Sequence, residues 1–280
     1  MYKIGFIGSG KMAGAIIKGL IKTSFAKPEE LIATQAETEG IDEKSRELGI
    51  KIILDNKELA HSEVIFIATK PNQAADVLEE IKPFITSDKL IASIAAGVTT
   101  EKLESHLPEN TRVIRIMPNT PALVGEGMSG MVGGKYADKQ DLEAGNTVVV
   151  IEHNLDFIYK LLSTIGKCII VDDEAQIDIV TAISGSGPAF YYKVINEIAR
   201  AGEKLGLDYE KALLLSIQTA IGSAKMALNR EISMEELISN VATKGGCTRV
   251  GVDCMDEYNT EKLFYDVIKS TAEKACALGK

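Results

Sequence analysis

The chain has 280 residues, 45% of them hydrophobic, which is enough for one large domain or two ordinary ones with a substantial core. It carries 31 Lys and Arg against 40 Asp and Glu, a formal net charge of −9, and no long basic run. Nucleic acid and anionic membrane surfaces are therefore excluded as expected partners, because both repel a negatively charged protein. A small anionic ligand stays compatible, since a local site can override the net charge.

The cysteine pattern is typical of a reduced, cytoplasmic protein. Cys168, Cys247, Cys254 and Cys276 form no C-x-x-C pair and have no histidine at metal-ligand spacing. We therefore expect neither a disulfide framework nor a metal site. The N-terminal apolar run is too short for a secretion signal, and no apolar window is long enough for a membrane span, so we expect neither.

Strand-like and helix-like segments alternate over the first 173 residues. Runs rich in β-branched residues predict strands at 2–8, 30–35, 51–55, 64–70, 90–97, 112–118 and 167–173. Helical spacing predicts helices at 11–24, 42–48, 73–82, 100–106 and 154–164. This alternation predicts an α/β fold, with a Rossmann-type, mostly parallel sheet over residues 1–173 that binds a dinucleotide.

From residue 174 the pattern predicts helices alone. Strand-like runs disappear, and helix-compatible stretches fill 174–184, 188–205, 208–229, 233–241 and 259–278. Pro188 stands at a predicted helix start and Gly206 at a helix end, while Ser233 and Glu236 match a capping box. Residues 174–280 are therefore predicted to form an all-α second domain.

The segment GFIGSGKMAG at 5–14 predicts a dinucleotide-binding loop. Its G-x-G-x-x-A pattern, at Gly8, Gly10 and Ala13, directly follows a strand and opens a helix, as this fingerprint requires. Gly8 would make the tight turn and Gly10 would let the backbone approach a pyrophosphate at the helix N-terminus. The next strand ends at Gln35, with neither the acid that binds an NAD ribose nor an arginine. That end favours NADPH as cofactor and leaves NADH open.

Three further segments are unusual. SGSGPA at 184–189 lacks a preceding strand, so we expect its glycines to separate two helices rather than to hold phosphate. IMPNTPALVGEG at 116–127 is a ligand-side loop at a strand end or an ordinary stiff connection. NVATKGGCTRVG at 240–251 is either a backbone site for a substrate carboxylate or a plain loop between helices.

Taken in order, these motifs resemble the pyrroline-5-carboxylate reductase family over essentially the whole chain. The matching segments are GFIGSGKMA, ATKP at 68–71, SIAAG at 93–97, RIMPNTPALVGEG, TAISGSGPAF, QTAIGSAKM at 218–226 and the GGCT loop. The resemblance implies that NADPH or NADH reduces the C=N bond of 1-pyrroline-5-carboxylate to L-proline, the last step of proline biosynthesis. It also implies a homodimer through the helical domains, with its active site at their interface, often built into a larger ring such as a homodecamer.

The resemblance also implies individual site residues. It places Gly245, Gly246, Cys247 and Thr248 on the substrate carboxylate, with Thr248 near the ring nitrogen and Glu231 in the same pocket as catalytic candidates. The cofactor-binding positions that it implies are Gly8, Ser9, Gly10, Lys11, Met12, Thr34, Gln35, Asn56, Ala68, Thr69, Lys70, Pro71, Ala95, Ala96, Gly97, Met117 and Asn119.

The chain departs from the family pattern in the substrate loop, where Ser-Pro-Gly-Gly-Thr-Thr reads TKGGCT at 243–248. The change loses a proline and adds Lys244, which assists the carboxylate or points to solvent. Glu231 either shuttles a proton or shapes the pocket. Two other functions stay open: a related imine or β-hydroxyacid reductase, with Lys225 as its catalytic lysine, and a non-catalytic nucleotide-sensing paralogue.

Overall fold

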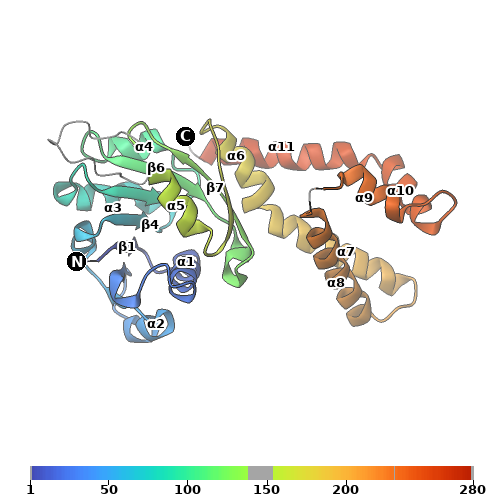
Figure 1. The fold of residues 1–280 in the computed structure, drawn as a ribbon, viewed down its shortest axis with the longest axis horizontal. Helices are drawn as coiled ribbons and strands as arrows, with labels where there is room; N and C mark the ends of the chain where they lie inside the picture. Colours follow the sequence, from blue (N-terminus) through green and yellow to red (C-terminus); the bar gives the residue numbers. More distant parts are fainter. Residues whose placement is uncertain (1, 138–153, 230, 279–280) are drawn as a thin grey trace. The chain divides into compact units, whose positions relative to one another are not determined.

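The protein, described by a computed structural model at residues 2–137, 154–229 and 231–278, folds into two compact units (Figure 1). Unit 1 comprises residues 1–186 with 271–280, and unit 2 comprises residues 187–270. The units therefore divide later in the chain than the predicted boundary after residue 173. The division into a dinucleotide-binding domain at 1–173 and a dimerisation and substrate-binding domain at 174–280 stays a prediction.

An eight-stranded sheet forms the centre of unit 1, with the strand order β3-β2-β1-β4-β5-β6-β7-β8. Neighbours pair in parallel except β6 and β7, which are antiparallel. The strands are β1 (Ile4–Ile7), β2 (Leu31–Thr34), β3 (Lys51–Ile53), β4 (Val64–Ile67), β5 (Leu90–Ser93), β6 (Arg112–Met117), β7 (Gly127–Gly133) and β8 (Gly166–Ile170). The predicted Rossmann-type, mostly parallel sheet is thus confirmed.

Helices cover both faces of this sheet (Figure 1). They are α1 (Lys11–Lys22), α2 (Ile41–Leu48), α3 (Ala74–Ile81), α4 (Thr100–Ser105), α5 (Asn154–Leu162) and α6 (Gln176–Val180), with short 3-10 turns η1 (Pro28–Glu30), η2 (Asn56–His61), η3 (Pro71–Gln73), η4 (Lys82–Phe84) and η5 (Thr120–Val124). Alternate residues of the central strands enter opposite layers of the core. Phe6 and Phe66 stack at 4.8 Å in the layer of α1, while Ile7 and Ile67 pack in the layer of α3.

Strand β7 was not predicted, because its sequence GMSGMVG is rich in glycine, which is uncommon in strands. Close approach explains these glycines. A Cβ at Gly127 would lie 2.8 Å from the carbonyl oxygen of Ile165, and one at Gly130 would lie 2.7 Å from Val180 of α6. Glycine therefore lets β8 and α6 pack tightly against this strand.

Unit 2 is helical, as predicted, and contains α7 (Gly187–Lys204), α8 (Tyr209–Ala227), α9 (Met234–Val241), α10 (Cys247–Glu257) and α11 (Thr260–Leu278), whose last residues belong to unit 1. Asp208 accepts a hydrogen bond from Lys211 N at 3.1 Å and Ser233 accepts one from Glu236 N at 3.1 Å, so side chains cap α8 and α9. Helix α10 was missed, because β-branched residues and a glycine weaken its helical signal. Within the described ranges, the helices are too short or too polar to span a bilayer.

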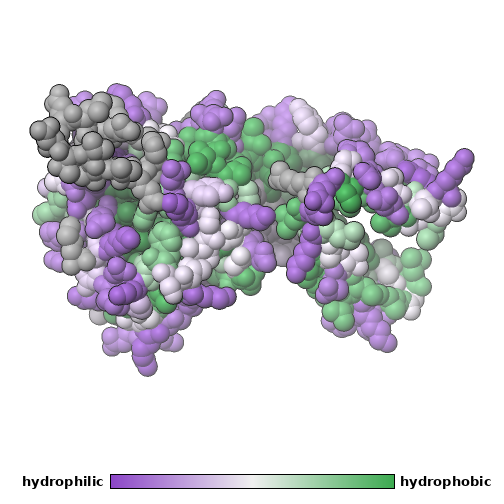
Figure 2. Space-filling view, viewed as in Figure 1, coloured by the Kyte–Doolittle hydropathy of each residue, from purple (hydrophilic) through white to green (hydrophobic). Residues whose placement is uncertain are grey.

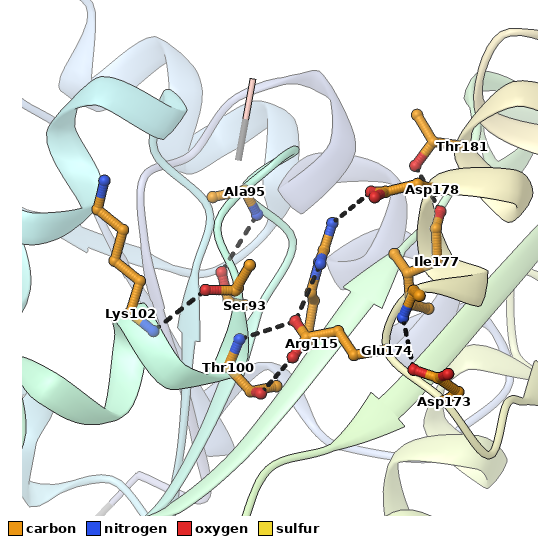
Figure 3. A network of polar contacts seen from close by, with 12 residues as sticks. Ser93, Ala95, Thr100, Lys102, Arg115, Asp173, Glu174, Ile177, Asp178 and Thr181 are labelled. Carbon is orange, nitrogen blue, oxygen red and sulfur yellow. Dashed lines mark hydrogen bonds and ion pairs between the residues drawn. The ribbon is translucent and has the colours of Figure 1, made fainter. Parts of the chain in front are cut away.

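A buried arginine fixes the start of α6 to the sheet (Figure 3). The Arg115 guanidinium, on β6, donates to Glu174 Oε1 at 2.9 Å and to Asp178 Oδ1 at 3.4 Å. Glu174 also accepts a hydrogen bond from the backbone N–H of Thr100 at 2.8 Å, at the start of α4. The Arg115 side chain is only 5% exposed, so the two carboxylates provide the compensation that this buried charge requires.

Replacing this arginine should destabilise unit 1 strongly. We expect Arg115→Met to lower the free energy of unfolding by roughly 3 kcal/mol, because it leaves two partly buried carboxylates without their cation. The matched control is Arg249→Met, since the Arg249 side chain also binds two carboxylates but is 37% exposed. It should lose less than about 1 kcal/mol. Equal losses in urea denaturation would contradict the role given to burial.

Candidate functional site

The turn between β1 and α1 requires glycine at its first position. Gly8 has φ +101°, and a Cβ there would lie 2.8 Å from the carbonyl oxygen of Ala68, which follows β4. The Gly8 N–H donates to Thr34 Oγ1 at 3.3 Å, at the end of β2. The turn is therefore held between the ends of the two strands that flank β1.

The N-terminus of α1 is arranged to bind an anion. The first intrahelical hydrogen bond runs from Gly14 N to Gly10 O at 2.8 Å, so the amides of Lys11, Met12 and Ala13 precede it. The first turn reads KMAG and carries no acid. A Cβ at Gly10 would meet no described atom within 4 Å, which leaves open space beside these amides. A pyrophosphate fits there by charge and by shape.

A cavity of about 530 Å³ extends from this turn across the ends of β1, β2 and β4. Its volume lies in the range of cofactor sites. The predicted cofactor residues that line it are Gly8, Ser9, Gly10, Thr34, Gln35, Asn56, Ala68, Thr69 and Lys70. The structure thus brings together residues from four separate segments of the sequence, at the point where the strand order reverses.

Three polar side chains in this wall already form hydrogen bonds within the protein. Thr34 Oγ1 donates to Asn56 Oδ1 at 2.7 Å, and Asn56 Nδ2 donates to Glu80 Oε2 at 2.8 Å. The Gln35 amide nitrogen donates to the carbonyl oxygens of Glu37 and Glu39, at 2.6 and 2.8 Å. These contacts fix the orientation of Asn56 and close the loop after β2.

Asn119 joins the MPNTPA segment to the SGSGPA segment. Its Nδ2 donates to both the carbonyl oxygen and the hydroxyl of Ser184, each at 3.2 Å, and its Oδ1 accepts from Met128 N at 2.9 Å. Ser184 in turn donates to Met128 O at 2.9 Å. The contacts that the structure gives Asn119 therefore hold segments of unit 1 together, and its predicted approach to the nicotinamide stays a prediction.

The SGSGPA segment lies between two helices, as expected, and its first residues form a π-helical turn. Helix α6 continues into this turn, η6 (Thr181–Gly185), which Ser186 N closes on Thr181 O at 2.8 Å, and α7 starts at Gly187. Gly185 faces Met117, whose Cε would lie 2.5 Å from a Cβ at that position. Such turns are rare in proteins, and many of those that occur lie at functional sites.

In unit 2, the GGCT loop opens α10 rather than serving only as a connection. Gly245 has φ +78° and makes the turn, and Gly246 precedes the first helical residue, Cys247. The amides of the first turn, including that of Thr248, lack intrahelical acceptors by helix geometry, and this turn carries no acid. Thr248 is partly exposed beside them. This set of donors suits a carboxylate.

Comparisons with known proteins cover the whole chain. A family model described as pyrroline-5-carboxylate reductase dimerisation matches residues 174–278, and one described as NADP oxidoreductase, coenzyme F420-dependent, matches residues 3–97. A pyrroline-5-carboxylate reductase of Methanosarcina acetivorans is 37% identical over 99% of this chain and 98% of its own. The chain belongs to the pyrroline-5-carboxylate reductase family.

Solved structures of this family have the same fold. A pyrroline-5-carboxylate reductase from Coxiella burnetii is 32% identical, covers 100% of this chain and 99% of its own, and superposes with a TM-score of 0.90. A Plasmodium falciparum pyrroline carboxylate reductase, solved with NADP bound, is 30% identical over 100% of this chain and 98% of its own, with a TM-score of 0.82.

The other predicted site residues of this reductase-family chain lie outside the cavity wall. Lys11 and Met12 begin α1, Pro71 begins η3, and Met117 ends β6. Ala95, Ala96 and Gly97 follow β5, where Leu278 of α11 approaches Gly97. Glu231 is exposed in the turn before α9. The roles predicted for all of them, and for the GGCT loop, stay predictions.

Sequence reasoning missed seven residues of the cavity wall, namely Ile7, Ala36, Lys44, Leu54, Gln73, Asp76 and Val77. Ile7 ends β1, Ala36 lies in the loop after β2, Lys44 lies on α2, Leu54 follows β3, and the last three lie in η3 and α3. The sequence fingerprint covers the β1–α1 turn and the end of β2, so it carries little signal for these positions. The position of Lys44, ten residues beyond β2, could have pointed to the ribose side of the site.

Two glycine substitutions should separate folding from nucleotide binding. Gly8→Ala should lower the free energy of unfolding by about 1–3 kcal/mol, because of its left-handed backbone and its contact with Ala68. Gly10→Ala should fold normally, since its φ of −68° suits alanine and space is free. It should weaken NADPH binding on the order of 10-fold, because the methyl group fills the approach to the amides. Thermal unfolding and fluorescence titration measure both; wild-type NADPH affinity in Gly10→Ala would contradict the assignment.

Proposed function

We propose that this chain is a pyrroline-5-carboxylate reductase, which reduces the C=N bond of 1-pyrroline-5-carboxylate to L-proline with NADPH, the last step of proline biosynthesis. The observation that carries the proposal is similarity to enzymes of that name along 99% of the chain. The nucleotide cavity of unit 1 and the amides at the start of α10 agree with it, because the reaction joins a dinucleotide to a small anionic ring.

In this proposal the cofactor occupies the cavity of unit 1. The amides of the first turn of α1 bind the pyrophosphate, and Gly10 gives it room. The wall formed by Thr34, Gln35 and Asn56 faces the adenosine ribose, and Ala68, Thr69 and Lys70 pass beneath the dinucleotide. Bound NADPH supplies the hydride; NADH is the alternative donor, because no acid at the end of β2 recognises its ribose specifically.

The substrate carboxylate is assigned to the turn at 245–248. The N–H groups of Cys247 and Thr248 donate to it, a role that tolerates cysteine because it needs only backbone. The Thr248 hydroxyl hydrogen-bonds the ring nitrogen and orients the C=N bond. A cyclic imine protonated from solvent accepts hydride at carbon readily. Positioning is therefore the main task of the protein, and it can lower a barrier by roughly 7–11 kcal/mol. Glu231 shapes this pocket in our proposal.

Association of two chains through the helical domain is the second part of the proposal. The match to a dimerisation family model covers residues 174–278. Large apolar side chains are exposed along the helices of unit 2, among them Tyr191, Tyr192, Leu214 and Leu215. Figure 2 shows hydrophobic residues on the surface of this unit. Burying such side chains against a second copy releases water and stabilises the pair. Assembly into a larger ring and a cytoplasmic location are expectations that accompany this proposal.

The function can be tested directly with the purified protein. Reduced nicotinamide absorbance should fall when 1-pyrroline-5-carboxylate is added with NADPH, and L-proline should appear in equal amount. Turnover of hydroxy acids but not of the pyrroline would instead support a β-hydroxyacid reductase that uses Lys225. Tight NADPH binding without reduction of any imine would support a nucleotide-sensing protein. Size-exclusion chromatography with light scattering should give at least a dimer.

The role of Thr248 predicts a specific kinetic defect. Thr248→Ala should keep NADPH affinity but reduce kcat/KM about 10-fold or more, since one hydrogen bond to the reacting group is lost. The matched control is the neighbouring Cys247→Ala, which keeps the backbone N–H and should retain most activity. Unchanged kcat/KM in Thr248→Ala would remove its hydroxyl from the mechanism.

A further inference from the structure

Lys44 is a cation in the cavity wall that the nucleotide fingerprint does not include. It lies on α2, directly after the loop that follows β2, and it lines the same cavity as Gln35, Ala36 and Asn56. In Rossmann-type sites the 2′ position of the adenosine ribose faces the end of β2. The other lysine of this wall, Lys70, follows β4 and so does not lie at the end of β2.

The charge of Lys44 is not fully used within the protein. Its ammonium lies 2.8 Å from Glu47 Oε2, but Lys18 binds the other oxygen, Oε1, also at 2.8 Å. Two cations therefore share one carboxylate, and the three side chains keep a net charge of +1. The two lysines hold the pKa of Glu47 down, to about 2, so this balance persists across the pH range of a folded protein.

The polar side chains of the ribose wall other than Lys44 already bind one another or the backbone. The Gln35 amide nitrogen is occupied by two carbonyl oxygens, and Thr34 and Asn56 bind one another. The carboxylate in the wall, Asp76, lies on α3. Glu80 lies next to Asn56 and already accepts a hydrogen bond from the Asn56 side-chain amide at 2.8 Å. Lys44 is thus the lysine of the cavity wall that lies on the helix after β2.

We propose that Lys44 selects NADPH over NADH by binding the 2′-phosphate of the adenosine ribose with its ammonium group. This inference rests on the cofactor half of the proposed function and is independent of the substrate. It assigns the preference for NADPH to a residue of α2, whereas the fingerprint places the arginine that binds a 2′-phosphate near the end of β2. Lysine binds phosphate as a point charge, so a flexible side chain on a nearby helix is sufficient.

The test measures binding of two probes to the full-length protein by calorimetry, namely 2′,5′-ADP, which carries the phosphate, and 5′-AMP, which lacks it. The wild type should bind 2′,5′-ADP about 10-fold or more tightly than 5′-AMP, as a charged hydrogen bond predicts. Lys44→Ala should remove most of that ratio with 5′-AMP affinity unchanged, which also shows that the cavity is intact. Lys44→Arg should retain it.

Lys18→Ala is the matched control, because Lys18 has the same charge and the same carboxylate partner but lies outside the cavity wall. It should change the ratio by less than about three-fold, as expected of a screened surface charge. Equal losses in both alanine variants, an unchanged ratio in Lys44→Ala, or no preference in the wild type would overturn the inference. Proline formation with NADH, measured separately, would still support the reductase under any of these outcomes.

Discussion

The close contact between the β1–α1 turn and the end of β4 is the constraint on which the nucleotide site depends. Gly8 passes so near the carbonyl oxygen of Ala68 that no side chain fits, and its N–H is held by Thr34. This contact aims the N-terminus of α1 across the carboxyl ends of three strands. Everything that the cavity offers a dinucleotide follows from that direction: free amides, open space at Gly10, and walls from β2 and β4.

Further along the chain, two polar networks hold the beginning of the helical region to the sheet. Arg115 binds Glu174 and Asp178 at the start of α6, and Asn119 binds Ser184 in the π-helical turn. Both donors lie at or just after β6. The motifs MPNTPA and SGSGPA, which are distant in sequence, are therefore one structural feature. These polar contacts explain why α6 and η6 belong to unit 1, although the sequence predicted them in the helical second domain.

In the proposed function an acidic chain binds two anions, so it needs local positive potential without many cations. Here the net charge is −9, and helix N-termini supply much of that potential. In the proposed function, α1 serves the pyrophosphate and α10 the substrate carboxylate, each through backbone N–H groups after a glycine. A protonated cyclic imine needs positioning more than acid catalysis, so this arrangement suits its reduction. Lys44 would then add one point charge for the 2′-phosphate.

The sequence by itself determined the alternating strands, the nucleotide turn and the helical second half, because these depend on local periodicity and on residues near one another in the chain. Close packing decided the remainder. Gly127 and Gly130 of β7 are explained by Ile165 and Val180, which lie close to them, and the π-helical turn contacts Met117 and Asn119, which lie far from it in the sequence. The place of Lys44 in the cavity wall likewise depends on how α2 returns beside β2, a relation that no local pattern encodes.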